Sequence, residues 1–413
     1  MITLKSFTDG SHIMPITSDV CVSVDVGCHS HSVAIGLPDG QVLDEFDLEH
    51  RPEGFKLFFQ RIDEYQCRYG GSVSVAMEGY NGWARPLDTL VRSHGYRLFN
   101  INNLKLARFK EIFPAAAKND RIDARKGLEL FQLCDHLPRA KGVLQEVVVT
   151  PAENEILKRL TRRRRALVDE KVRVVNRLQS DLQAVCPGLL GITNNVENAW
   201  FLNFLTHSDK LTKLARLRCK TLLGIRAVGC KYAAIIVAWQ KNATFSHDVE
   251  CAGPMILEDA CRIVELRTAI KALETKCARL IEQSQHAQLI DSIPGYGLVC
   301  SAELAGEIGT IDRFSSEASL ALYIGMANLD NSSGTQRGSK IPRQVNTRAK
   351  AAMMVGVDKH RKVIPESQRY YEKKRAQGKT HNQAIRALGR HLCRVIFQML
   401  KQGRPYEIRE PKT

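Results

Sequence analysis

The chain has 413 residues, with 60 Lys or Arg against 44 Asp or Glu, giving a formal net charge of +16 at pH 7. This length predicts two or three domains, and an apolar fraction of 44% excludes a disordered or fibrous protein. No run approaches the roughly 18 apolar residues of a membrane span, and no secretory signal opens the chain. The twelve cysteines form no C-x-x-C pair, which predicts reduced thiols in a cytoplasmic protein with no membrane partner.

The positive charge is concentrated in the later part of the chain. Residues 1–150 contain 17 basic and 19 acidic side chains, whereas residues 151–413 contain 43 and 25. Such an asymmetry favours a polyanionic partner for the second part, although many basic proteins bind no nucleic acid.

An α/β domain is expected over residues 20–150, after a polar, flexible tail at 1–19. β-Branched runs and turn residues predict strands, and helical spacing predicts helices between the later strands. Three strands of a meander followed by alternating helices and strands is the ribonuclease-H-like order. The predicted strands are 21–27, 31–37, 41–47, 72–77 and 96–101, and the predicted helices are 52–65, 84–92 and 115–134.

The rest of the chain has helical patterning. Residues 152–186 lack Gly and Pro, and Leu160, Leu167 and Val174 recur every seven positions, which predicts a long helix with a coiled-coil or hairpin partner. Ile-Pro-Gly-Tyr-Gly at 293–297 fits either half of a helix-hairpin-helix or a tight interhelical turn. Further helices are expected at 201–215, 258–283 and 298–308. The predicted divisions are a coiled-coil and helical segment at 151–285, a mainly α domain at 286–400 and a tail at 401–413.

Four carboxylates stand where the predicted elements would bring them together. Asp25 ends the first strand and Glu78 ends the fourth, and these strands are neighbours in a ribonuclease-H-like sheet. Asp120 and Asp123 share one face of the third helix. Four such acids would suit two Mg²⁺ ions that stabilise the oxygens of a phosphodiester during cleavage. Alone, a pair such as Asp120 and Asp123 would more often form a solvated helix face.

The chain resembles the DEDD transposases of the insertion-sequence-110 family, which are related to the Piv and MooV DNA invertases. The resemblance extends over roughly residues 20–400, in the family's order. Its motifs are Ser-Val-Asp-Val-Gly at 23–27, Ala-Met-Glu-Gly-Tyr at 76–80, Lys-Asn-Asp-Arg-Ile-Asp-Ala at 118–124, Ser-Ile-Pro-Gly-Tyr-Gly at 292–297, Glu-Ile-Gly-Thr-Ile-Asp-Arg-Phe at 307–314, Ala-Leu-Tyr-Ile-Gly-Met at 321–326 and Ser-Ser-Gly-Thr-Gln-Arg-Gly at 332–338.

The resemblance implies a recombinase with a split active site. Its N-terminal domain would be RuvC-like, with Asp25, Glu78, Asp120 and Asp123 as metal ligands for Mg²⁺, two per site, or for Mn²⁺ as a substitute. Ser333, directly before a glycine, would attack the DNA backbone and form a phosphoserine link. The family further implies a structured guide RNA from the same element, donor and target DNA, assembly from dimer to tetramer, and a place at the nucleoid.

From the residues alone, the serine loop allows two interpretations. Ser333 lies in a polar, glycine-rich loop with the cations Arg337, Lys340 and Arg343, which suits a nucleophile that approaches a phosphate. The residues Asn-Ser-Ser-Gly at 331–334 would also suit a simple turn. Ser332 is the competing hydroxyl.

Two basic runs are candidate nucleic-acid contacts. Four consecutive arginines on one helix point in all directions, so we expect that acids of the chain cannot pair with all of them. Residues 337–379 contain 13 cations against three acids, with Tyr370 and Tyr371 as possible stacking surfaces. The arginines of the first run are Arg162, Arg163, Arg164 and Arg165.

Two other functions compete with the recombinase. A RuvC-type, metal-dependent nuclease or junction resolvase would cut by water attack, with no covalent intermediate and no need of Ser333. A nucleic-acid-binding scaffold would do no chemistry, but the complete set of acids and serine argues against it.

Overall fold

The computed structural model describes residues 20–79, 82–102, 106–107, 120–136, 143–335, 338–340, 342 and 345–408. The predicted tail at 1–19 and the end of the tail at 401–413 lie outside these residues. The chain divides into two compact units, residues 1–148 and 149–413. In the described residues no helix is long and apolar enough to cross a membrane. The cysteines whose side chains are described are free thiols.

Unit 1 contains a six-stranded mixed sheet, in the order β3-β2-β1-β4-β5-β6. The first three strands form the expected antiparallel meander, while β1 pairs with β4, and β4 with β5, in parallel. The antiparallel edge strand β6 was not predicted, because three residues are too short for a periodic signal. The strands are β1 (Val20–Val26), β2 (Ser30–Gly36), β3 (Val42–Glu49), β4 (Val73–Glu78), β5 (Arg97–Ile101) and β6 (Leu144–Glu146).

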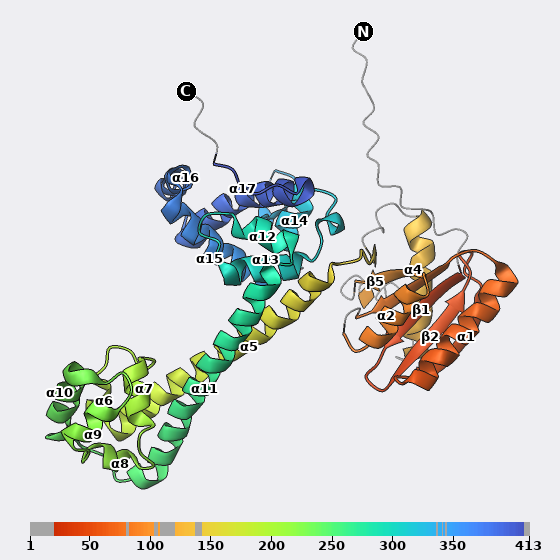
Figure 1. The fold of residues 1–413 in the computed structure, drawn as a ribbon. Helices are drawn as coiled ribbons and strands as arrows, with labels where there is room; N and C mark the ends of the chain where they lie inside the picture. The colour runs from red at the N-terminus through yellow and green to blue at the C-terminus, as the bar shows by residue number, and fades with distance from the viewer. Residues whose placement is uncertain are drawn as a thin grey trace. The chain divides into compact units, whose positions relative to one another are not determined.

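Helices cover both faces of this sheet, as Figure 1 shows for α1 (Pro52–Tyr69), α2 (Arg85–Ser93) and α4 (Asp120–His136). Alternate strand residues belong to different cores. Val20, Val22 and Val24 of β1 pack in the core beneath α1 and α2, whereas Cys21 packs with the buried residues of α4. Successive side chains therefore alternate between the two helical layers.

Unit 2 contains two long helices, α5 (Ala152–Val185) and α11 (Val249–Ile281), which lie side by side (Figure 1). They are antiparallel, since Arg164 pairs with Glu274 while Arg177, farther along α5, pairs with Asp259. The predicted helix at 201–215 is instead two short helices. Between the long helices lie α6 (Pro187–Leu190), α7 (Ala199–Leu205), α8 (Leu211–Leu214), α9 (Cys219–Gly224) and α10 (Gly229–Gln240).

The last part of unit 2 is mainly helical around a core shared by α13, α15 and α17. The glycine turn before α13 packs onto the backbone of α15, because a Cβ at Gly295 would overlap His360. This contact fits the tight-turn interpretation of the Ile-Pro-Gly motif. The elements are α12 (Gln285–Asp291), α13 (Leu298–Ile308), a 3₁₀ turn (Ile311–Arg313), α14 (Glu317–Tyr323), β7 (Leu329–Asp330), β8 (Ser339–Lys340), α15 (Thr347–Val363), α16 (Pro365–Ala376) and α17 (His381–Gln402).

A buried histidine makes unit 1 sensitive to acid. His31 of β2 is 1% exposed, and its Nε2 lies 2.9 Å from Nδ1 of His50. Burial, together with the neighbouring His50, lowers the pKa of His31 to about 4. In the unfolded chain the imidazole would titrate near its ordinary value, so between the two pKa values the unfolded state binds the extra proton.

We expect the free energy that protects β1 and β2 from opening to fall by about 1 kcal/mol between about pH 7.5 and about pH 5.5 through His31 alone. Hydrogen-exchange protection factors of the β1 and β2 amides, corrected for intrinsic exchange, measure this. His31→Gln removes the titrating group and should flatten that part of the slope. An unchanged slope in His31→Gln would show that other groups carry it.

Candidate active site

Asp25 and Glu78 lie at the same end and on the same face of the sheet. The parallel register pairs Val24 of β1 with Met77 of β4, so the next residue on each strand is Asp25 or Glu78. On both strands the valines alternate with the side chains that face α4. Asp25 and Glu78 fall in the α4-facing set, two residues beyond Ser23 and Ala76. The parallel pairing therefore brings these two carboxylates to one edge.

Helix α4 runs antiparallel to β1, which brings its first turn to this edge. Arg121 donates to Asp47 at 2.8 Å, and Asp47 lies in the same cross-strand row as Asp25, through Ser32. One turn later Arg125 pairs with Glu45, which lies in the row nearer the start of β1. Asp123 lies between these two arginines on α4, and Asp120 begins the helix.

The close approach of α4 to β1 depends on a glycine. A Cβ at Gly127 would overlap the hydroxyl of Ser23 and come within 3.3 Å of Ile101. Gly127 therefore lies directly over β1. Asp123, four residues earlier, shares the Gly127 face of the helix. The helix thus brings Asp123 toward the end of the sheet at which Asp25 and Glu78 lie.

The described carboxylates share this edge without forming a compact ligand cluster. Among the described side chains, no three Asp, Glu, His or Cys groups converge as a metal site. The side chain of Asp120, the fourth acid predicted from sequence, lies outside the described part. The donors are all carboxylate oxygens, the type that Mg²⁺ and Mn²⁺ prefer, so their chemistry fits such an ion.

Asp47, in the same cross-strand row as Asp25, already has hydrogen-bond partners within the chain. Asp47 accepts 2.6 Å and 2.8 Å hydrogen bonds from Ser32 and Arg121, and these bonds hold its pKa below the ordinary value. Asp47 therefore fixes the start of α4 and stays ionised.

The predicted serine lies on a small hairpin in unit 2. Strands β7 and β8 pair antiparallel, with Leu329 opposite Lys340, and the amide of Asn331 donates to the carbonyl of Gly338 at 2.9 Å. The hydroxyl of Ser332 donates to Asp330 at 2.7 Å. Ser333 is exposed, and within the described part of the chain its hydroxyl has no hydrogen-bond partner. The cation Lys340 is exposed, while Arg337 and Arg343 lie outside the described residues.

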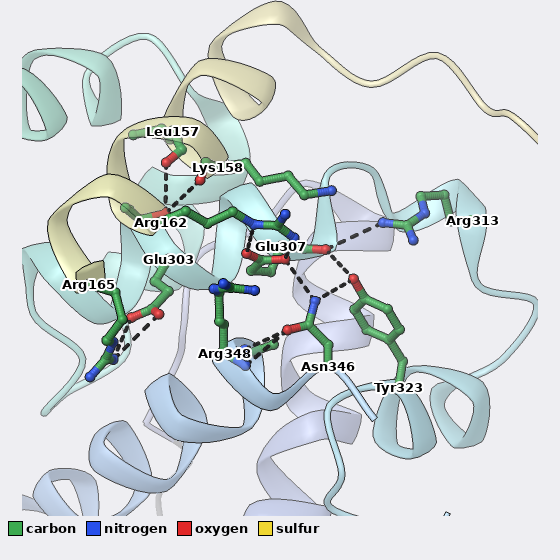
Figure 2. Close-up of polar contacts among 12 residues, drawn as sticks. Leu157, Lys158, Arg162, Arg165, Glu303, Glu307, Arg313, Tyr323, Asn346 and Arg348 are labelled. Carbon is green, nitrogen blue, oxygen red and sulfur yellow. Dashed lines mark hydrogen bonds and ion pairs between the residues drawn. The ribbon is translucent and has the colours of Figure 1, made fainter. Parts of the chain in front are cut away.

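The arginine run is more extensively paired than the sequence suggested. Arg162 pairs with Glu307 and Arg165 with Glu303, both acids of α13 (Figure 2), while Arg164 pairs with Glu274 of α11. Arg163 is exposed and has no ion pair among the described residues. The sequence showed the density of charge, but not that α11 and α13 supply acids at three of the four positions.

The tyrosines of the second basic run also have partners within the chain. The Arg361 guanidinium lies 4.1 Å from the ring centroid of Tyr371, and Lys374 lies 5.3 Å from that of Tyr370. Each ring therefore already has a cation over it.

Sequence reasoning missed a set of polar residues around Glu307. Figure 2 shows this buried acid between Arg162, Asn346 and Tyr323, from three different segments. Two signals were present in the sequence. Glu307 opens one of the family-like motifs, and asparagine is a residue type favoured at N-caps, the position that Asn346 takes before α15.

Two family models match the chain, and both describe transposases. A model of the DEDD transposase of IS110 elements matches residues 22–187, and a model of the transposase of the IS116/IS110/IS902 family matches residues 287–372. Together they cover more than half of the chain. The chain belongs to the IS110 family of DEDD transposases. As a transposase it is an enzyme that cuts and rejoins DNA.

Proteins of insertion elements resemble the transposase over most of its length. It is 27% identical to the 43.6 kDa protein of insertion element IS110 from Streptomyces coelicolor, over 96% of this chain and 98% of that protein. It is 25% identical to the 44.8 kDa protein of IS116 from Streptomyces clavuligerus, over 78% and 81%. It is 26% identical to the 42 kDa protein of IS900 from Mycobacterium paratuberculosis, over 82% and 85%.

The contact between Gly127 and Ser23 gives a test of how α4 is held on the sheet of the transposase. We expect Gly127→Ala to destabilise unit 1 by about 1–3 kcal/mol, because the added methyl forces α4 away from β1. Ser23→Ala removes the hydroxyl that the methyl would overlap, so the double variant should recover most of the loss. Hydrogen exchange of the β1 amides measures both effects.

The matched control is Gly224→Ala on α9, where a Cβ would meet nothing within 4 Å. It should leave β1 unchanged. If Gly127→Ala proved as harmless as Gly224→Ala, the close approach of α4 to β1 would be wrong.

Proposed function

We propose that the transposase cuts DNA through a covalent phosphoserine at Ser333, assisted by a divalent metal at Asp25, Glu78, Asp120 and Asp123. The observation that carries the proposal is the position of Asp25 and Glu78. Each directly follows a residue of the last β1–β4 pair, at the end of the sheet where the first turn of α4 lies. The RuvC-like assignment of unit 1, carried by the family resemblance, is part of the same proposal.

The metal would be Mg²⁺, two ions per site, with Mn²⁺ as a substitute. Bound there, it would supply charge that stabilises the attacking and leaving oxygens of the phosphodiester. The carboxylates would hold it through oxygen donors, with Asp25 and Glu78 contributed by neighbouring strands and Asp120 and Asp123 by one helix turn.

Ser333 suits the nucleophile better than Ser332. The hydroxyl of Ser332 is engaged by Asp330, whereas that of Ser333 is exposed and free to approach a phosphate. In the proposed step the Oγ of Ser333 forms a bond to phosphorus and loses its proton, and the bond from phosphorus to one DNA oxygen breaks. That oxygen takes a proton and leaves as a DNA hydroxyl.

The covalent step explains how strands can be rejoined without another energy source. One phosphoester bond is formed for each that is broken. The phosphoserine therefore conserves a phosphoester bond, which a DNA hydroxyl can attack later. Resealing reverses the transfer: the new DNA oxygen bonds to phosphorus, and the serine leaves and regains its proton.

The proposed partners are DNA at the element ends and target, and a structured guide RNA of the same element. The excess of cations in residues 151–413 and the family resemblance support both. Arg163 and Lys340 are exposed cations, whereas Arg162, Arg164 and Arg165 already pair with acids. Arg337 and Arg343 belong to the same proposed surface. Assembly as a dimer or tetramer and a place at the nucleoid also rest on the family resemblance.

A metal-dependent nuclease that uses water is the second candidate. The observation that favours it is that the four acids all belong to unit 1. Ser333 belongs to unit 2, so the proposed metal site would need no residue of the serine loop. The two functions differ in whether protein becomes bonded to DNA.

We expect Ser333→Ala to abolish a covalent protein–DNA adduct, whereas Ser332→Ala leaves one. The assay incubates the protein with element-end DNA, the RNA encoded beside its gene and Mg²⁺, then denatures and separates the products on a gel. Asp25→Asn should also abolish the adduct, because it removes one of the four metal ligands. Cut DNA that carries no protein in the wild-type reaction would favour the nuclease instead.

A further inference from the structure

A buried carboxylate lies beneath the two ends of the serine loop. Glu307, next to last in α13, is fully buried. Arg162 of α5 donates two hydrogen bonds to it, with Nε 2.7 Å from Oε1 and Nη2 2.9 Å from Oε2. The side-chain amide of Asn346 donates to Oε2 at 2.7 Å (Figure 2). The carboxylate thus links the long helix α5 to the residue at which the loop ends.

The two ends of the loop are joined to each other at this point. The segment that carries Ser333 leaves α14 after Tyr323 and returns at Asn346, whose backbone amide donates to the carbonyl of Tyr323 at 2.8 Å. The hydroxyl of Tyr323 donates to the carbonyl of Glu307 at 2.8 Å, and the side-chain amide of Asn346 lies 2.7 Å from that hydroxyl. Both ends of the loop are therefore fixed to one residue of α13.

Asn346 performs two tasks at once. Its Oδ1 caps α15 by accepting from the backbone amides of Arg348 and Ala349, at 3.1 Å and 3.0 Å. Its Nδ2 donates to Glu307. Aspartate would keep the cap but would place a second carboxylate against Glu307, and serine would keep the cap but has no amide to donate. The amide of Asn346 therefore meets both requirements, whereas aspartate and serine each meet only one.

The charge of Glu307 is maintained by its partners. Burial raises the pKa of this carboxyl, but the hydrogen bonds from Arg162 and Asn346 outweigh burial and leave the pKa below its ordinary value. Glu303, one turn earlier on α13 and 2% exposed, has Arg165 as its only ion-pair partner among the described residues. For Glu303 burial prevails and the pKa is raised. Of these two buried glutamates, Glu307, which also holds the loop, has the lowered pKa, and Glu303 has the raised one.

We propose that Glu307 and Asn346 are positioning residues that fix the base of the serine loop, and so the place at which the hydroxyl of Ser333 is presented to DNA. The inference rests on the proposed role of Ser333 as nucleophile. Neither residue needs to touch DNA. Arg162 is the anchor on α5, so the inference assigns this arginine of the basic run to the loop.

The test compares Glu307→Gln and Asn346→Asp with the control Glu303→Gln. The control makes the same change on the same helix at the same depth, and it also removes an ion pair to α5. Among the described residues, no hydrogen bond or ion pair joins Glu303 to the loop. The full-length protein is assayed with element-end DNA, its RNA and Mg²⁺. Two quantities are measured, the single-turnover rate of adduct formation at saturating DNA and the dissociation constant for that DNA.

We expect Glu307→Gln and Asn346→Asp each to slow adduct formation by roughly 10–100-fold, because a small misplacement of a nucleophile has an effect of this order. DNA affinity should stay within about twofold, because the reacting geometry and not the binding surface is changed. Hydrogen exchange should increase in residues 324–346 and stay unchanged in α5 and α11. Glu303→Gln should change neither the rate nor the exchange of the loop.

The outcomes separate the two proposals. If Ser333→Ala abolishes the adduct while Glu307→Gln and Asn346→Asp form it at the normal rate, the positioning role is wrong and the nucleophile stands. An equal loss of rate in Glu303→Gln would also overturn the positioning role, because general packing of α13 would then explain it. If Ser333→Ala still forms the adduct, the nucleophile is wrong and the inference falls with it.

Discussion

The parallel pairing of β1 with β4 is the constraint on which the acidic edge depends. Because the register is fixed at Val24 and Met77, the two strands place Asp25 and Glu78 next to each other on one face. A shift of one residue in either strand would turn its acid toward α1 and α2. The antiparallel course of α4, held by Arg121 on Asp47, then brings Asp123 to the same edge. The position of these acids therefore follows from the pairing of the two strands and from the course of α4.

In unit 2 the corresponding constraint is a buried carboxylate. Glu307 is costly to bury, and its cost is offset because Arg162 and Asn346 both donate to it. The same contacts close the loop that carries Ser333 and begin α15. An arginine that the sequence predicts as a nucleic-acid contact can thus be paired with a buried acid of the same chain. Arg163 is the member of that run that is exposed and has no ion pair among the described residues.

Much of unit 1 could be predicted because its signals are local. β-Branched runs and turn residues gave five strands, and the register that unites Asp25 with Glu78 follows from the expected strand order. The short edge strand β6, the division of the helix at 201–215 and the contacts of Glu307 could not be predicted. They depend on partners distant in sequence, such as Asn346 for Glu307, and no periodicity encodes such a pairing. The predicted roles of Asp25, Glu78, Asp120, Asp123 and Ser333 stay predictions.

The proposed binding of a divalent metal where β1, β4 and the first turn of α4 meet can be tested directly. Fe²⁺ in place of Mg²⁺, with ascorbate and peroxide, cleaves a polypeptide next to the site at which the ion is held. If the metal is held there, we expect cuts close to Asp25, Glu78 and Asp123 that Mg²⁺ competes away and that Asp25→Asn abolishes. Cuts confined to other parts of the chain, or cuts at this edge that persist in Asp25→Asn, would contradict it.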